Sequence, residues 1–141
     1  MVSCNHDKVF EKYEKMNDNK WLKSQAFTFE VPIEDTSIVY DISLTIRHAE
    51  YYPYANILIS IDQVTPSGEE RYKNFDLRLR NTDGSFIGDG SGDIWDTKIL
   101  VYKKMSFNNR GTYKFVVENH MPYVETEGIM EIGFVVEKAK D

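Results

Sequence analysis

Residues 38–47 read Ile-Val-Tyr-Asp-Ile-Ser-Leu-Thr-Ile-Arg, with a large apolar side chain at every second position. The positions between them are mostly polar or charged. Successive side chains of a β-strand point to opposite faces of the sheet, so this period of two predicts a strand with one buried face. The buried set is expected to be Ile38, Tyr40, Ile42, Leu44 and Ile46.

The same alternation continues on both sides of this stretch. It recurs over residues 27–31, 57–61, 75–79, 99–107, 113–117 and 130–136. Turn-forming residues separate the runs, as at Pro66-Ser67-Gly68 and Asn108-Asn109-Arg110-Gly111. About seven to eight strands at this spacing predict an all-β chain folded as an antiparallel β-sandwich, of Greek-key or jelly-roll type.

Size and charge narrow the class of protein further. The 141-residue chain has the size of one domain. It contains no apolar run near the ~18 residues that a membrane-spanning helix needs. Its 17 basic and 23 acidic residues give a net charge of -6, whereas binding to nucleic-acid phosphates requires a basic surface. We therefore expect no nucleic-acid partner.

The first twenty residues differ from the rest of the chain. We expect residues 1–20 to form a tether and residues 21–141 to form the sandwich domain. Val9, Tyr13 and Met16 have the spacing of one face of a short helix, although a tether with one docked aromatic patch fits the same residues.

Cys4 is the single cysteine, so a disulfide within the chain is excluded. Ser3 precedes it, and a small residue before a cysteine near the N-terminus resembles the end of a bacterial lipoprotein signal, where the cysteine becomes acylated. The alternative is an incidental thiol near a chain end. We predict Cys4 as a lipidation site.

No motif for catalysis is present. His6 falls in the expected tether, and His48 and His120 fall at strand ends, where we expect them to face water. The chain has no HExxH, no GxSxG and no phosphate-binding loop, so nothing favours a zinc hydrolase, a serine hydrolase or a nucleotide enzyme. We expect no cofactor.

The connection at residues 83–96 is unusually rich in glycine and aspartate. Asp89, Ser91 and Asp93 have the alternate-residue spacing of calcium ligands, but Ile94 stands where an EF-hand requires glycine. Calcium is therefore the weaker alternative, and the preferred interpretation is an ordered connection whose carboxylates cap turns. Its apolar side chains are expected to plug the core: Phe86, Ile87 and Trp95.

Tyr51, Tyr52 and Tyr54 surround Pro53 directly after the long second strand. Their rings could form an aromatic platform for a sugar or a peptide, because tyrosine combines an apolar ring with a polar tip. They could equally close one end of the sandwich as a rigid corner. We take the three tyrosines as candidate partner-contacting residues.

Several short motifs, taken in order, resemble the GldH lipoprotein family of Bacteroidota over residues 9–137. No single motif is diagnostic, but their order and spacing together are specific. They are Trp21, Asp35-Thr36-Ser37, Ile46-Arg47, Tyr52-Pro53-Tyr54-Ala55-Asn56-Ile57, Pro66-Ser67-Gly68, the loop from Asp83-Gly84 to Gly92-Asp93, Gly111-Thr112-Tyr113, Gly128-Ile129 and Ile132-Gly133.

The resemblance implies a lipoprotein made with a signal peptide and carrying fatty acid (palmitate) on Cys4. It implies attachment to a membrane of the cell envelope through this anchor only, with the domain facing the periplasm. It further implies an accessory role in the gliding-motility and type IX secretion machinery, through contact with other envelope proteins. It implies no catalytic activity, and it leaves the oligomeric state open.

Two other functions are compatible with the residues. A carbohydrate-binding β-sandwich could use the tyrosine cluster and the acidic connection. A jelly-roll hydrolase would need a cleft with paired carboxylates or a strongly perturbed titratable group. An interaction protein should instead show a large exposed apolar patch or an unprotected edge strand.

Overall fold

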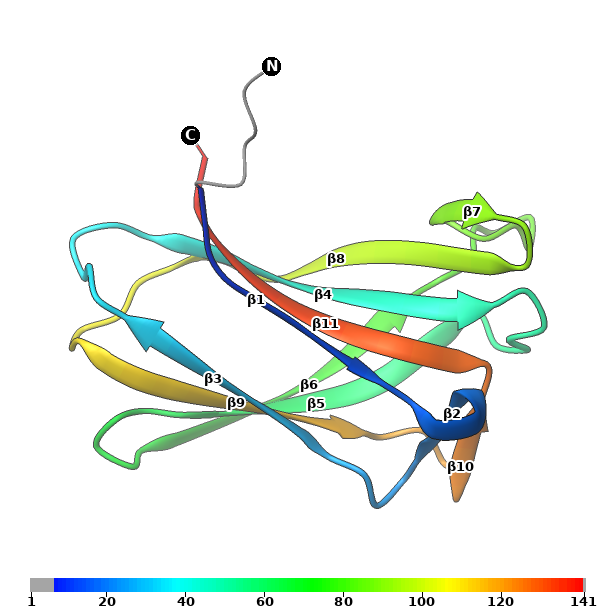
Figure 1. The fold of residues 1–141 in the computed structure, drawn as a ribbon, viewed down its shortest axis with the longest axis horizontal. Coiled ribbons are helices and arrows are strands. Elements are labelled where there is room, and N and C mark those ends of the chain that lie inside the picture. The colour runs from blue at the N-terminus through cyan, green and yellow to red at the C-terminus, as the bar shows by residue number, and fades with distance from the viewer. Residues whose placement is uncertain (1–6, 141) are drawn as a thin grey trace.

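The computed structural model describes residues 7–140 and confirms an all-β chain with antiparallel sheets (Figure 1). A short 3-10 turn, η2 (Asn17–Asn19), follows the first strand, and within residues 7–140 no helix is long and apolar enough to cross a membrane. The strands are β1 (Lys8–Lys15), β2 (Lys20–Leu22), β3 (Phe27–Ile33), β4 (Tyr40–Ala49), β5 (Asn56–Val64), β6 (Glu70–Arg78), β7 (Asp89–Ser91), β8 (Ile94–Met105), β9 (Gly111–Asn119), β10 (Glu125–Glu127) and β11 (Ile129–Lys138).

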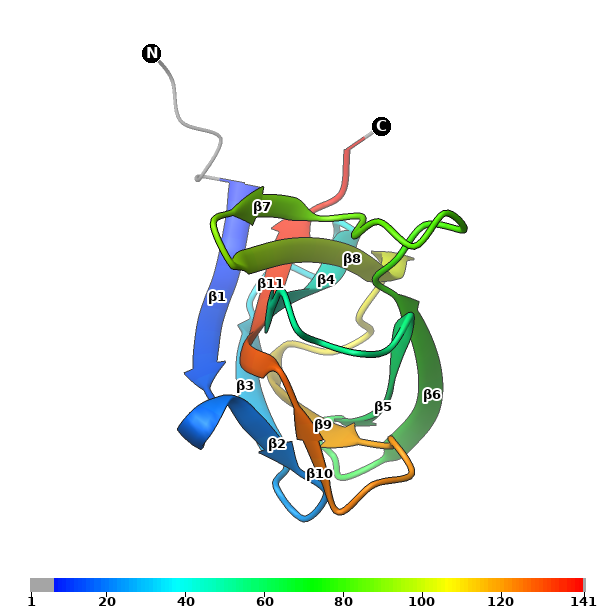
Figure 2. The same ribbon diagram turned by 90° about the vertical axis from the view of Figure 1, so that its right-hand side faces the viewer.

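Two large sheets face each other across the core (Figures 1 and 2). The five-stranded sheet has the order β1-β11-β4-β8-β7, and the four-stranded sheet has the order β3-β9-β5-β6. Leaving aside the three-residue strands β2, β7 and β10, each strand lies in the opposite sheet from the strand before it, except that β5 and β6 share one sheet. This is the strand order of a jelly roll. The predicted β-sandwich is confirmed.

Inward side chains of both sheets meet in one core. Phe134 of β11 packs against Phe29 of β3 and Phe115 of β9, with ring centroids 5.0 Å and 4.9 Å apart. Burial of one such side chain stabilises a fold by about 1.5–3 kcal/mol. As its alternation predicts, β4 adds the buried side chains Tyr40, Ile42, Leu44 and Ile46.

The short strands β2 and β10 close one end of the sandwich (Figure 2). Trp21 of β2 is completely buried there, and its indole nitrogen donates to the carbonyl oxygen of Gln25 at 2.8 Å. The Asn119 amide donates to the Trp21 carbonyl oxygen at 3.0 Å and to the Thr126 hydroxyl at 3.2 Å. These bonds tie β2, β9 and β10 into one cap.

The prediction of a short helix from the spacing of Val9, Tyr13 and Met16 was wrong. Val9 and Tyr13 belong to β1, which pairs with β11 at the edge of the five-stranded sheet. An edge strand needs few apolar side chains, and its charges protect the open edge, so β1 lacks a clear period of two. The segment expected to be a tether, residues 1–20, is thus part of the fold from Lys8 onward, while Cys4 lies outside the described residues.

His48 is also placed differently from the expectation. It is completely buried, whereas His120 is exposed as expected. The inward alternation of β4 extends one step beyond Ile46, which turns the His48 ring into the core. The ring lies against Phe86 and Tyr52, with centroids 4.5 Å and 5.5 Å away.

The connection at 83–96 is ordered by hydrogen bonds and pairing. The Asp83 carboxylate caps a turn by accepting from the backbone N–H and the hydroxyl of Ser85, at 2.9 Å and 2.6 Å. The chain then forms β7 and turns into β8. Phe86 is buried and Trp95 is half-buried. Ile87 is exposed, so the expectation that Ile87 fills the core was wrong.

Candidate functional site

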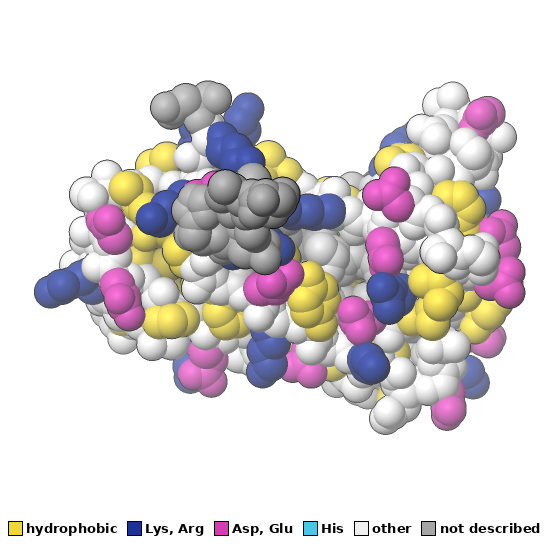
Figure 3. Space-filling model, turned by 45° about the horizontal axis from the view of Figure 1, so that its top comes forward, with side chains coloured by type: hydrophobic (Ala, Val, Ile, Leu, Met, Phe, Trp, Pro, Cys, Tyr) yellow, Lys and Arg dark blue, Asp and Glu magenta, His cyan; other side chains and the backbone are white. Residues whose placement is uncertain are grey.

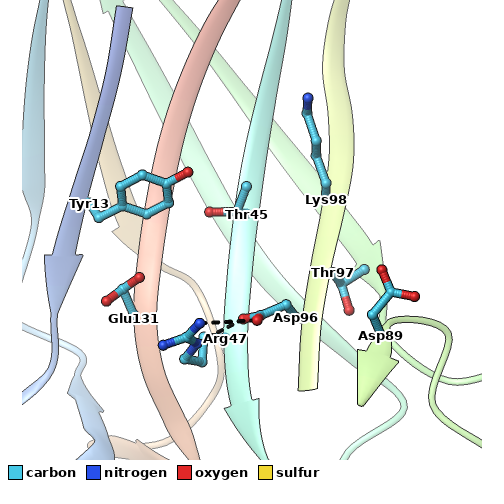
Figure 4. Close-up of a pocket in the computed structure, with 8 residues that line it drawn as sticks. All are labelled: Tyr13, Thr45, Arg47, Asp89, Asp96, Thr97, Lys98 and Glu131. Carbon is cyan, nitrogen blue, oxygen red and sulfur yellow. Dashed lines mark hydrogen bonds and ion pairs between the residues drawn. The ribbon is translucent and has the colours of Figure 1, made fainter. Parts of the chain in front are cut away.

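A polar groove crosses the outer face of the five-stranded sheet, the face turned away from the core (Figures 3 and 4). Its volume is about 390 Å3, within the ~300–1,000 Å3 typical of small-molecule sites. Acidic and basic side chains intermingle on this face (Figure 3). The lining residues are Tyr13, Thr45, Arg47, Asp89, Asp96, Thr97, Lys98 and Glu131.

Gly133 of β11 lies between two lining residues of the groove, Tyr13 of β1 and Thr45 of β4. A Cβ atom at this position would overlap the Thr45 hydroxyl and stand 2.5 Å from the Tyr13 ring. Because glycine has no side chain, the ring of Tyr13 lies across β11 towards Thr45 (Figure 4). Gly133 therefore lets two lining residues of the groove, Tyr13 and Thr45, approach each other across β11.

An ion pair spans the centre of the groove. Arg47 of β4 and Asp96 of β8 are cross-strand partners, and Nε and Nη2 of Arg47 donate to the two carboxylate oxygens at 2.8 Å and 3.1 Å. This two-point geometry holds both side chains in fixed positions. The hydrogen bonds to Asp96 raise the pKa of the Arg47 guanidinium.

Tyr13 forms one side of the groove. Its hydroxyl donates to Oε2 of Glu11 at 2.6 Å. Partial burial against the sheet and this bond raise the pKa of Tyr13 to about 12, and the same bond lowers the pKa of Glu11. Tyr13 therefore stays protonated in neutral solution.

The hairpin of β7 and β8 forms the other side and projects from the sheet (Figure 2). Gly90 lets the Trp95 ring pack onto β7, since a Cβ atom there would be 2.8 Å from that ring. The Trp95 indole nitrogen donates to Glu50 at 2.7 Å. Asp89 of β7 faces the groove from this side (Figure 4).

A second surface of a different kind lies at the closed end of the sandwich. We call it the apolar tip, and it consists of Leu22, Pro122, Tyr123 and Val124 around a shallow hollow of about 580 Å3. Val124 is 84% exposed, and Leu22 and Tyr123 are 44% and 41% exposed. Lys23 joins the two segments, because its backbone N–H donates to Val124 and its ammonium group to Met121.

The three predicted tyrosines lie in different environments. Tyr52 is completely buried, and its hydroxyl donates to the Asn56 carbonyl oxygen at 2.7 Å. Tyr51 is exposed, and Tyr54 stacks on Tyr123 of the apolar tip with ring centroids 5.1 Å apart. Tyr52 thus closes the core, while a contact role remains a prediction for Tyr51 and Tyr54.

The calcium alternative gains no support from the structure. Asp89 and Ser91 form part of β7, and the backbone carbonyl of Asp93 accepts from the N–H of Glu50 at 2.7 Å. Among residues 7–140, no three His, Cys, Asp or Glu side chains gather as a metal site would require.

Comparison with known proteins places the chain among lipoproteins. The family model of the GldH lipoprotein matches residues 8–136. The chain belongs to the GldH lipoprotein family. The gliding motility lipoprotein GldH of Flavobacterium johnsoniae is 29% identical over 145 residues, an alignment covering 98% of this chain and 89% of that protein. A gliding motility lipoprotein GldH homolog of Christiangramia forsetii is 27% identical and covers 97% of this chain and 88% of its own length.

Among solved structures, the Yersinia pseudotuberculosis-derived mitogen aligns over 94% of this chain and 89% of its own, with a TM-score of 0.35 and 7% identity. The family assignment rests on the family model, and the sequence relatives agree with it.

Sequence reasoning missed both surfaces of this GldH-family protein. The outward positions of the strand at 38–47, including Thr45 and Arg47, carry the groove, and Gly133 interrupts an otherwise apolar run. A glycine inside a strand does signal a close approach by other atoms. The apolar tip had no such signal, because its two segments are about 100 positions apart and meet only through β2 and β10.

Proposed function

We propose that this GldH-family protein is a non-catalytic envelope lipoprotein, anchored through Cys4, that contributes to gliding motility and type IX secretion by binding other envelope proteins. The names of the relatives support the setting, since both are gliding motility lipoproteins. The domain would face the periplasm.

The apolar tip is the observation that carries the contact function. Isolated exposed apolar residues are common, but a group of them around a hollow is typical of a protein-binding surface. Leu22, Tyr123 and Val124 come from two chain segments that hydrogen bonds hold together. A preformed surface loses little conformational entropy when a partner binds.

The position of the anchor relative to the apolar tip indicates that the tip binds a protein and not the membrane that holds the anchor. β1 starts on the opposite side of the molecule from β2 and β10 and runs towards them (Figures 1 and 2). Its eight residues cover about 26 Å. The four peptide steps from Cys4 to Lys8 reach at most ~14 Å. A lipid on Cys4 would therefore leave the tip facing away from its membrane.

The titratable groups of the groove support a role without catalysis. A general acid or base works best with a pKa near the working pH. The shifts at Tyr13 and Arg47 are both upward, which moves these groups further from neutrality. The Asp96 carboxylate, in turn, is occupied by the guanidinium of Arg47.

Membrane fractionation and affinity purification from the native envelope test this proposal. We expect Leu22→Ser combined with Val124→Ser to stay in the membrane fraction but to lose its co-purifying proteins. Leu100→Ser is the matched control, because Leu100 is 48% exposed on β8, away from the tip. Cys4→Ser should leave the membrane fraction and lose fatty-acid labelling.

These surface changes should alter the free energy of unfolding by no more than ~0.5 kcal/mol, so loss of the partner cannot be attributed to loss of the fold. Unchanged co-purification in the double variant would refute the contact function. Unchanged fatty-acid labelling of Cys4→Ser would refute the anchor.

A further inference from the structure

We propose that the groove on the five-stranded sheet is a second binding site and that it takes a neutral saccharide. This inference goes beyond the contact function of the apolar tip, which lies on a different part of the molecule. It rests on the shape, the hydrogen-bonding groups and the charge balance of the groove.

The shape indicates a site for a small ligand. The groove is bounded by Tyr13 on one side and by the β7–β8 hairpin on the other, and Thr45 lies between them (Figure 4). Both sides are held by packing and hydrogen bonds, including those of Tyr13 with Glu11 and of Trp95 with Glu50. The hollow is thus already formed in the unliganded protein.

The hydrogen-bonding groups match adjacent hydroxyls. Arg47 uses two of its five N–H donors on Asp96. The remaining N–H donors of Arg47 therefore lie beside the remaining acceptor lone pairs of the Asp96 carboxylate. Two neighbouring hydroxyls of a sugar ring can donate to such a carboxylate and accept from such a guanidinium. Within residues 7–140, the side chains of Thr45 and Glu131 make no hydrogen bond to another protein group, so both can add to this set.

The charge balance disfavours an anionic ligand. Arg47 is paired with Asp96, and Lys98 is paired with Glu137 at 2.8 Å. An anion would meet the remaining carboxylates of Asp89 and Glu131 at the lining. A neutral ligand with many hydroxyls avoids this repulsion, and the ring of Tyr13 offers an apolar surface to its C–H groups.

The test is a glycan array carrying neutral and acidic oligosaccharides, probed with the full chain, followed by calorimetry on each bound glycan. We expect at least one neutral oligosaccharide to bind. We expect binding to weaken by at least about tenfold in each of three variants, Tyr13→Ala, Arg47→Lys and Asp96→Asn. Tyr13→Ala and Asp96→Asn each remove a directed contact, and Arg47→Lys removes the planar guanidinium group.

Tyr72→Ala is the matched control. Tyr72 is an exposed tyrosine on the edge strand β6 of the other sheet, so its loss should leave saccharide binding unchanged. Tyr13→Phe, which keeps the ring, guards against a folding defect in Tyr13→Ala and should bind more tightly than that variant. The Leu22→Ser, Val124→Ser protein should bind saccharide like the wild type, which separates this site from the tip.

Binding of acidic glycans alone would overturn the proposal, as would the absence of any glycan binding. Equal affinity of the wild type and the three groove variants would overturn it too, since the ligand would then sit elsewhere.

Discussion

At the scale of single residues, His48 is the most unusual side chain. Its Nδ1 lies 3.0 Å from the Ala49 carbonyl oxygen, and its buried Nε2 has no hydrogen-bond partner within residues 7–140. Burial is the largest effect and lowers the pKa of His48; the guanidinium of Arg80 also lowers it, whereas the hydrogen bond with the Ala49 carbonyl and the carboxylates of Glu50 and Asp96 raise it. The ring is therefore neutral in the folded state.

This burial predicts a loss of stability in mildly acidic solution. An unfolded chain binds a proton on His48 near the ordinary pKa of about 6.5, whereas the folded chain resists it. The unfolded state thus binds more protons as the pH falls below that value, and the free energy of unfolding should decrease by up to ~1.4 kcal/mol per pH unit. Urea unfolding between pH 7.5 and 5 measures this slope.

His48→Leu should flatten the slope over the same range, and His120→Gln should leave it as in the wild type. His120 is the appropriate control because it is exposed. A His48→Leu protein with the wild-type slope would assign the pH dependence to other groups.

At the scale of elements, strands with one buried face were predictable and the edge strand was not. The alternation of residues 38–47 predicted the buried side chains Tyr40, Ile42, Leu44 and Ile46 of β4, whereas Ile38 precedes the strand and is only partly buried. β1 was not predicted, because it pairs with a neighbour on one side only and its outward positions carry charged side chains and Tyr13, which hide the alternation. Its place beside β11 comes from a pairing between the two ends of the chain, which no local pattern encodes.

The candidate site was less predictable than the fold for a related reason. Alternation identifies which side chains point outward, but not which strands lie beside each other. Arg47 and Asp96 are 49 positions apart and become neighbours only when β4 pairs with β8. Likewise, Tyr54 meets Tyr123 only after the sheets have closed.

Gly133 tests the interaction between β1, β11 and β4. Gly133→Ala should destabilise the fold by about 1–3 kcal/mol, because the new methyl group overlaps Thr45 and Tyr13. Tyr13→Ala in the same chain should recover part of that loss, since the ring is one of the two obstacles. Urea unfolding of the two single variants and the double variant gives the coupling free energy. Strict additivity would show that the ring does not rest on Gly133.

At the scale of the whole molecule, three features lie on separate parts of one jelly roll. β1 begins on the side where a lipid on Cys4 would hold the protein, and the apolar tip lies at the closed end of the sandwich (Figures 1 and 2). The groove lies on the outer face of the five-stranded sheet. A protein arranged in this way can bind a partner at the tip while it remains attached to its membrane.

The most direct test of the contact function is site-specific photo-crosslinking in living cells. A photoreactive residue at position 124 samples the apolar tip, and one at position 100 samples an exposed apolar position on β8, away from the tip. We predict a discrete protein adduct from position 124 that is absent from position 100. The same adducts from both positions, or lipid adducts alone from position 124, would contradict the contact function of the tip.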